Sequence, residues 1–255
     1  MTSNLLWKSL YKLEEADWVV VGIPWEGSVS ARKGTAKAPG ALRKWFQDYW
    51  TYDMKKKADL TDRKIVDLGD ISVGTTYSSM ANGVAKTVKM IKEKNKKAKI
   101  LFIGGDHSVT PAITKNLKIK NFLMMDAHLD LMDAYEGNKN SHACTARRVY
   151  EQGVDVNLIG IRTGSEEEYK FAEKYIKWDD NMKFKGIVDY VSIDVDIMDP
   201  IYIDTGAPEA FGAKPEQVVD IINNTKFKYC DITEWIPDSG YPVMVSLVKN
   251  ILWKP

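Results

Sequence analysis

A chain of 255 residues that is 44% hydrophobic can bury one sizeable core, so we expect a single domain over residues 1–255. Its 36 lysines and arginines balance 35 aspartates and glutamates, which argues against a nucleic-acid-binding surface. No apolar run reaches the roughly 18–20 residues that cross a bilayer, and the first residues lack a signal-peptide cleavage pattern. We expect a cytoplasmic protein without nucleic-acid or membrane partners. Cys144 and Cys230 fit free thiols there, although the sequence leaves a disulfide open.

Short apolar and β-branched runs predict strands at residues 18–24, 64–70, 98–105, 121–128, 156–162, 190–196 and 228–235. Most of these runs are continuous rather than alternating, which is typical of strands buried on both faces of a parallel sheet. Amphipathic segments between them predict helices at residues 78–97, 165–177 and 214–225. The alternation of strands and helices predicts an α/β fold with an open, mostly parallel, doubly wound sheet.

Polar residues stand where four of the apolar runs end. GGDHS follows the third run, DAHLD the fourth, DVD the sixth and DITEW the seventh. In open α/β sheets, ligands bind outside the carboxyl ends of the strands. We therefore expect these four segments to bring acids and imidazoles to one edge of the sheet.

The ionisable residues in these segments alternate, and alternate residues of an extended chain face the same side. The resulting set holds four carboxylates and two imidazoles, from His107, Asp126, His128, Asp130, Asp194 and Asp196. Bare carboxylates would repel one another, whereas two divalent cations would neutralise four of them. Oxygen-rich ligands without a thiolate favour Mn²⁺ or a similar ion over a structural zinc.

Each motif also has an ordinary structural explanation. A single DxH or DxD pair often caps a turn, and a single buried histidine is more often a hydrogen-bonded core residue than a ligand. The chain has only three histidines, however, and all of them stand beside these acids or shortly after them. The sequence therefore favours a metal site with two cations, which would lower the pKa of a shared water.

Two further residues complete the predicted site. His142 is not needed as a ligand and could shuttle a proton, unless it is a supporting or unused loop histidine. Glu234 ends the last apolar run and could hold a cationic substrate by paired hydrogen bonds, unless it only caps a helix.

These motifs resemble the ureohydrolase family of arginases and agmatinases. The resemblance lies in GGDHS at residues 104–108, DAHLD at 126–130 and the segment 192–200, with further matches at 67–70, 159–162 and 204–212. It implies a three-layer α/β/α fold, two manganese ions per chain held by the six residues above, and hydrolysis of a guanidino group to urea and an amine. It also implies that Asp130 orients the attacking water and takes its proton, and that His142 shuttles protons. Glu234 would hold the guanidinium, and the chain would form a trimer or hexamer.

The chain departs from the family pattern at a few positions. Ala143 stands where glycine is usual after the shuttling histidine, as in archaeal agmatinase-like members, and Ala207 replaces a usual threonine. The segment 22–45, which shapes the pocket in the family, is diverged. The identity of the substrate is therefore the least determined property of the chain.

The loop LMDAYEGNKNSHA, residues 131–143, bears on that choice. Asp133 and Glu136 would repel the α-carboxylate of arginine, so we expect agmatine as the substrate, with Asp133 and His142 among its contacts. Lys139 and Asn140 could instead bind a carboxylate. Arginine and other guanidino or formimino compounds stay as alternatives, and a mononuclear zinc deacetylase-like hydrolase is a more distant one.

Overall fold

The computed structural model describes residues 11–255, and within that range no helix is long and apolar enough to span a bilayer. The prediction that the chain lacks a signal peptide concerns mainly residues 1–10, which lie outside the described residues.

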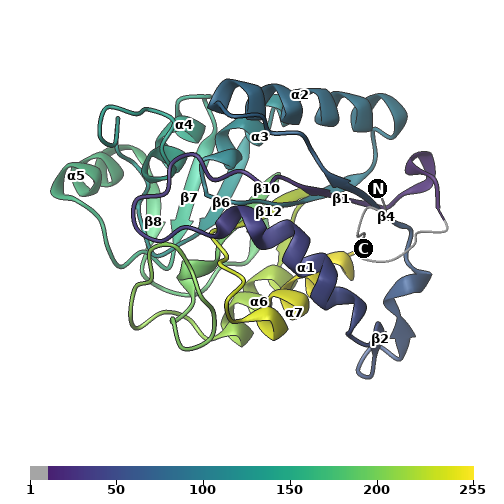
Figure 1. Ribbon diagram of the computed structural model, residues 1–255. Coiled ribbons are helices and arrows are strands. Elements are labelled where there is room, and N and C mark those ends of the chain that lie inside the picture. Colours follow the sequence, from purple (N-terminus) through teal and green to yellow (C-terminus); the bar gives the residue numbers. More distant parts are fainter. Residues whose placement is uncertain (1–10) are drawn as a thin grey trace.

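An eight-stranded sheet forms the centre of the molecule (Figure 1). Its strands lie in the order β4-β1-β5-β12-β10-β6-β7-β8, and every neighbouring pair is parallel. Their bounds are β1 Trp18–Gly22, β4 Ile65–Asp70, β5 Lys99–Ile103, β6 Asn121–Met125, β7 Asp155–Ile159, β8 Lys177–Asp179, β10 Tyr190–Asp194 and β12 Tyr229–Thr233. Two small ribbons add β2 Tyr52–Asp53 with β3 Ala58–Asp59, and β9 Gly186–Ile187 with β11 Thr225–Lys226.

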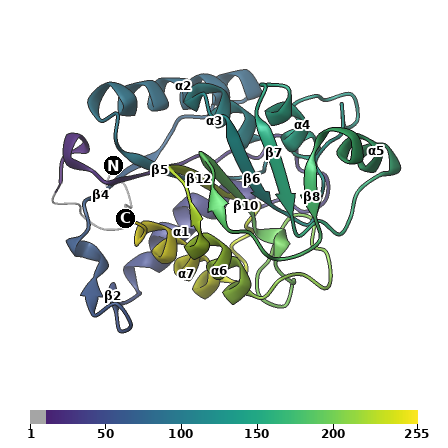
Figure 2. The ribbon, with the colours of Figure 1, turned by 180° about the vertical axis from the view of Figure 1, so that it is seen from behind.

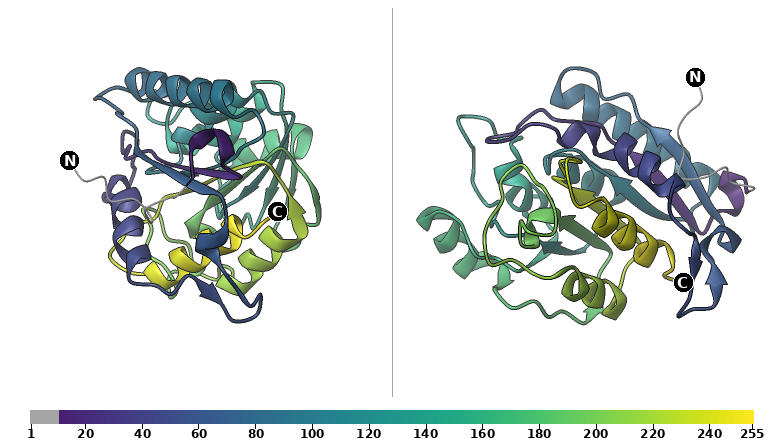
Figure 3. Two further views of the ribbon diagram at one scale, coloured as in Figure 1. Left: turned by 90° about the vertical axis from the view of Figure 1, so that its right-hand side faces the viewer. Right: turned by 60° about the horizontal axis from the view of Figure 1, so that its bottom comes forward.

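Helices cover both faces of the sheet, so the fold has three layers (Figures 1 and 2). One face carries α2 Tyr77–Lys94, α3 Val109–Leu117, α4 Thr145–Tyr150 and α5 Glu166–Tyr175, and the other carries α1 Ala38–Gln47, α6 Pro215–Asn224 and α7 Tyr241–Leu252. The left view of Figure 3 shows the sheet between the two helical layers. Each interface is a separate buried apolar cluster. The predicted α/β fold with a parallel, doubly wound sheet is confirmed.

All seven predicted strands and all three predicted helices are present, with shifted ends. β6 ends at Met125 and β10 at Asp194, before the last residues of the strands that we expected there. The prediction missed β8 and the helices α1, α3, α4 and α7. Pro39 and Gly40 in α1 and Pro111 in α3 are typical of loops in a sequence, but both prolines lie in the first turn, where a helix tolerates them. Both helices are stabilised by burial against the sheet.

The order of the strands brings the predicted site together. β5, β12, β10 and β6 are the four adjacent central strands, although β10 and β12 follow β6 in the sequence by more than sixty residues. Because all four are parallel, their carboxyl ends lie along one edge. The segments GGDHS and DAHLD start directly after their strands, and DVD starts at the last residue of β10. DITEW starts inside β12, so only Glu234 and Trp235 lie beyond that strand.

A buried ion pair joins α1 to the edge strand β4. The guanidinium of Arg43 contacts both carboxylate oxygens of Asp67, at 2.8 and 3.0 Å, and also contacts Asp70. Only 3% of the Arg43 side chain and 2% of that of Asp67 are exposed, so each charge depends on the other.

We therefore expect Arg43→Ala to lower the free energy of unfolding by about 3–5 kcal/mol, because it leaves a buried carboxylate without its cation. Chemical denaturation would measure the change. Arg43→Lys, which keeps the charge but loses the paired geometry, should cost less. Equal stability of wild type and Arg43→Ala would show that the ion pair does not hold α1 in place.

Candidate functional site

The acids at the ends of β6 and β10 are turned back by hydrogen bonds to their own backbone. Asp126 Oδ1 accepts the N–H of His128 at 2.6 Å, and Asp194 Oδ1 accepts the N–H of Asp196 at 2.9 Å. Asp130 has a positive φ of 50°, which is unusual for a residue other than glycine. The expected convergence through strand alternation is therefore wrong in its cause. The residues do converge, but through tight turns after the strands have ended.

His107 stands at the centre of the cluster and is fully buried. Its Nε2 lies 2.9 Å from Ser192 Oγ, and that hydroxyl donates to Asp231. A ring that donates from Nε2 presents the lone pair of Nδ1 to the other side. There Nδ1 lies 3.1–3.2 Å from the carboxylates of three residues, Asp126, Asp130 and Asp194.

His128 belongs to a second group that shares Asp126 with the first. Its Nδ1 lies 3.4 Å from Asp126 Oδ1 and 2.9 Å from Asp196 Oδ2. Its other ring nitrogen, Nε2, lies 3.8 Å from a carboxylate oxygen of Glu209. Within the described part of the chain, two groups have ligand atoms close enough to hold a metal ion: His107, Asp126 and Asp130, and Asp126, His128 and Asp196.

Unpartnered atoms support a metal in this place. His107 Nδ1 and Asp126 Oδ2 lie 3.2 Å apart, but both are buried and neither makes a hydrogen bond, which is costly unless something else satisfies them. Both atoms belong to the residues that could ligate a cation. A buried set of carboxylate oxygens and imidazole nitrogens without sulfur fits divalent cations of the Mn²⁺ type.

Burial and the close approach of several charges shift the pKa values of the residues in this cluster. Burial lowers the pKa of His107 and His128, but the neighbouring carboxylates outweigh it, raising that of His128 to about 12 and that of His107 well above its usual value. Burial and the charge of Asp126 raise the pKa of Asp130 to about 6. Burial, with Asp196 and then Asp126, raises the pKa of Asp194 well above its usual value. Without a metal, the two imidazoles and Asp194 therefore hold protons more readily than usual, whereas for Asp126 the effect of burial is outweighed by the same imidazoles, which lower its pKa.

His142 and Glu234 lie next to the metal-binding groups. Glu234 follows β12 with a φ of 63°, and its Oε1 accepts the N–H of His107 at 2.7 Å. His142 Nδ1 lies 3.3 Å from the same oxygen. Burial lowers the pKa of His142, but Glu234, Asp130 and Asp106 raise it to about 9. The second oxygen of Glu234, Oε2, is buried and has no hydrogen-bond partner.

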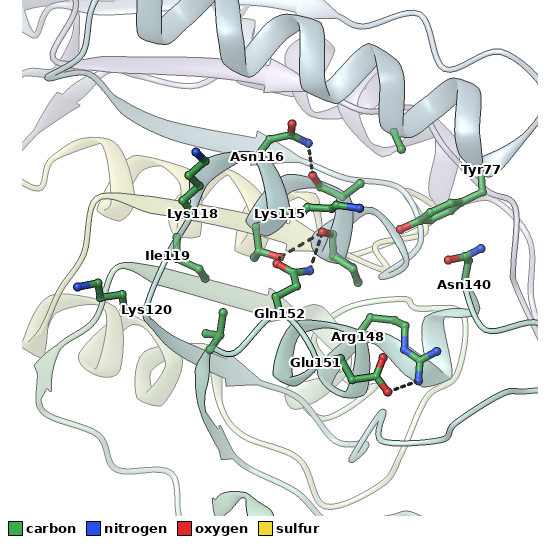
Figure 4. A pocket seen from close by; sticks show the side chains of 15 residues that line it. Tyr77, Lys115, Asn116, Lys118, Ile119, Lys120, Asn140, Arg148, Glu151 and Gln152 are labelled. Carbon is green, nitrogen blue, oxygen red and sulfur yellow. Dashed lines mark hydrogen bonds and ion pairs between the residues drawn. The ribbon is translucent and has the colours of Figure 1, made fainter.

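A cavity of about 200 Å³ joins these groups. Its lining includes His128, Asp130, Asp194, Asp196, His142 and Glu234. A larger cleft of about 790 Å³ lies between α2, α3 and α4, lined by residues such as Tyr77, Lys115, Gln152 and Arg148 (Figure 4). It contains none of the residues of the two metal-binding groups. The smaller cavity is therefore the candidate active site.

Asp133 does not line this cavity. Its carboxylate lies 3.2 Å from Arg148 Nη2 and 3.3 Å from Lys139 Nζ, and its side chain is 48% exposed. These cations also lower its pKa. The expected repulsion of a substrate carboxylate by Asp133 therefore has no support in the structure, and neither does its expected contact with substrate.

Sequence reasoning missed the residues that form a hydrogen-bond network on the Nε2 side of His107. Asp231 is fully buried within β12 and accepts hydrogen bonds from Ser192, Tyr190 and Thr110. A carboxylate in the middle of an apolar strand was a usable signal, because such a residue needs several donors. Its donors come from β10 and α3, and only the fold brings them together.

Comparison with known proteins agrees with this geometry. The family model described as the arginase family matches residues 16–254. The chain is 34% identical over 223 residues to an agmatinase of Pyrococcus horikoshii, covering 82% of this chain and 79% of that protein. It is 35% identical over 227 residues to an N(1)-aminopropylagmatine ureohydrolase of Thermococcus kodakarensis, covering 84% and 79%. The solved agmatine ureohydrolase of Thermoplasma volcanium superposes with a TM-score of 0.89 at 25% identity, covering 99% and 94% of the two chains.

The chain thus belongs to the arginase family. Members of this family are metal-dependent hydrolases that act on carbon–nitrogen bonds of amidines and guanidines.

Because a metal ion that binds the two imidazoles must displace their protons, we expect affinity for Mn²⁺ to fall as the pH is lowered. Groups with raised pKa values hold their protons below those values, so each proton released should change the affinity about tenfold per pH unit. Calorimetric titration of the metal-free protein between pH 6 and 8, in buffers of different ionisation enthalpy, would measure both affinity and proton release. An affinity that does not vary with pH would contradict the protonated, metal-free cluster.

Proposed function

We propose that the chain is a dinuclear manganese enzyme that hydrolyses agmatine to putrescine and urea. The observation that carries the proposal is the sharing of one cavity by two metal-binding groups and a His142–Glu234 pair. The names of its relatives support the same chemistry, since both curated relatives reported above are hydrolases of agmatine or an agmatine derivative by name.

Six residues are proposed as metal ligands: His107, Asp126, His128, Asp130, Asp194 and Asp196. Two divalent cations would offset the four carboxylates and, when bound, would supply a nucleophilic water near neutral pH. The hard oxygen ligands favour Mn²⁺. A mononuclear zinc deacetylase-like enzyme would not need both groups of ligands, so the presence of both argues against it.

Glu234 is proposed to hold the guanidinium of the substrate. Oε1 is used by the His107 N–H, whereas Oε2 is buried without a partner in a residue that lines the cavity. A guanidinium N–H donated to Oε2 would satisfy that atom and fix the orientation of the electrophilic carbon.

Two residues are proposed to transfer protons, one when water attacks the guanidinium carbon and one when the amine leaves. Asp130, a carboxylate that lines the cavity, is proposed to orient the attacking water and to accept its proton. His142, which is paired with Glu234 and lines the same cavity, is proposed to donate a proton to the leaving amine. Without that proton, the amine would be a poor leaving group.

The lining of the cavity favours a substrate without an α-carboxylate. Among residues 11–255, those that line it include no lysine and no arginine. Beyond the proposed ligands and catalytic groups, the wall includes the acid Glu168 and uncharged side chains such as Ser30, Tyr135 and Thr163. Lys139, an expected partner for a carboxylate, is paired with Asp133 outside the cavity. A buried, unpaired carboxylate would be costly here, so agmatine is favoured over arginine.

We expect the catalytic efficiency, kcat/KM, to be at least ~10–100-fold higher for agmatine than for arginine, because the wall offers no cation to the α-carboxylate. Urea release from agmatine, arginine, 4-guanidinobutyrate and N(1)-aminopropylagmatine at fixed pH and Mn²⁺ would measure it. Equal or better turnover of arginine would exclude the agmatine assignment and leave the hydrolase intact. Preference for the aminopropyl compound would identify the longer amine as the substrate.

His142→Ala should lower kcat by about 10²–10⁴-fold while keeping the metal content of about two Mn²⁺ per chain, because it removes a proton donor and no ligand. Asp126→Ala, the matched variant in the shared ligand, should lose metal and activity together. Elemental analysis and kinetics on the same preparations separate the two effects. Loss of metal from His142→Ala would show that this histidine is a ligand.

Assembly into a trimer or hexamer, which rests on the family resemblance, stays a prediction. A cytoplasmic location, which rests on the sequence, also stays a prediction.

A further inference from the structure

The segment 26–34, here called the strap, crosses from the end of β1 to the region of the active site. The carboxylate of Glu26 accepts the N–H of Gly34 at 2.5 Å, which closes the strap on itself. Near its far end, Arg32 pairs with Asp204 and its N–H donates to the carbonyl of Gly206 at 3.2 Å. The strap is thus a defined loop with fixed ends.

Asp106 fixes the near end of the strap. Its Oδ2 accepts the N–H groups of Gly27 and Ser28 at 2.7 and 2.9 Å. Its Oδ1 accepts the N–H and the hydroxyl of Ser108 at 3.0 and 2.5 Å. All four bonds lie within the protein and the side chain is fully buried, so this carboxylate is used as a clamp.

The backbone contact beneath this clamp is equally close. The N–H of Asp106 donates to the carbonyl of Trp25 at 2.9 Å. A Cβ at Gly105 would lie 1.7 Å from that carbonyl oxygen, so only glycine allows the residue before the strap to come so near. The GGDHS segment therefore holds the strap next to His107.

The strap then reaches His142 through one side chain. Ser28 Oγ accepts the backbone N–H of His142 at 2.9 Å. His142 begins a short 3-10 turn, His142–Cys144, after the loop that contains Asp133 and Tyr135. Ser28 does not line the cavity, whereas Ser30 on the same strap does. Ser28 thus contacts the backbone of His142 without lining the cavity.

We propose that Ser28 is a positioning residue for His142, held in place by Asp106, and that it sets the distance between the imidazole and Glu234. The inference rests on the proposed function, since it assigns His142 the proton transfer. His142 Nδ1 lies 3.3 Å from Glu234 Oε1, and Glu234 is itself bound to the His107 N–H. Both partners of the imidazole–carboxylate pair are thus fixed from the same segment, Gly105–Ser108. One is fixed directly, and the other is fixed through Asp106 and Ser28.

The test compares Ser28→Ala, which removes the acceptor, with Ser28→Thr, which keeps the hydroxyl. Lys33→Ala, an exposed position on the same strap, is the control. We expect Ser28→Ala to lower kcat about tenfold or more with little change in KM or Mn²⁺ affinity, because small misplacement of a catalytic group costs rate. Ser28→Thr should restore most of kcat, and Lys33→Ala should behave as wild type.

Hydrogen exchange of the His142 amide, followed at single-amide resolution in the full chain, tests the contact without turnover. Loss of one hydrogen bond should speed its exchange about tenfold in Ser28→Ala, and Ser28→Thr should restore protection. Unchanged exchange and unchanged kcat in Ser28→Ala would overturn the proposal, as would equal defects in the Ala and Thr variants. Loss of metal affinity in Ser28→Ala would also overturn it. Absence of urea from every guanidino compound with wild-type protein would instead refute the proposed function.

Discussion

The structure depends on the compensation of four carboxylates buried at one edge of the sheet. Asp126, Asp130, Asp194 and Asp196 crowd around two imidazoles, and each buried carboxylate that is left uncompensated costs several kcal/mol. In the metal-free protein, protons on the imidazoles and on the acids with raised pKa values reduce the negative charge. Cations would replace these protons, so metal binding, proton release and stability are linked in this site.

The composition of the site was accessible from the sequence for a physical reason. Acids and histidines placed directly after apolar runs have few explanations in a chain with only three histidines, and parallel strands deliver their ends to one edge. The geometry was less accessible. Alternation along a strand predicted the convergence of Asp126 with Asp130. In the structure β6 ends at Met125, and tight turns after it bring these side chains together. The order β5-β12-β10-β6 also could not be derived from single runs, because it depends on crossovers of the whole chain.

Contacts between distant segments set the limit of sequence-based prediction. Asp231 supports His107 through Ser192, which is 39 residues away, and Ser28 binds the backbone of His142 across 114 residues. No local pattern marks such pairs. The same limit explains Asp133, whose charge suggested a role in selecting the substrate. In the fold its neighbours Arg148 and Lys139 neutralise it, and it lies outside the cavity.

The arrangement separates the chemistry from the choice of substrate. His107 offers a ring nitrogen to the proposed metal site and, through its backbone N–H, binds the acid proposed to hold the guanidinium. A shift of that backbone would therefore disturb both proposed binding groups. In the proposed function, the tail of the substrate would instead meet the strap, the loop 131–143 and the loop 204–207, which contribute Ser30, Tyr135 and Ala207 to the cavity. Substitutions in these loops can alter the accepted amine without moving a ligand, which is why the reaction is more firmly determined by this structure than the length of the substrate.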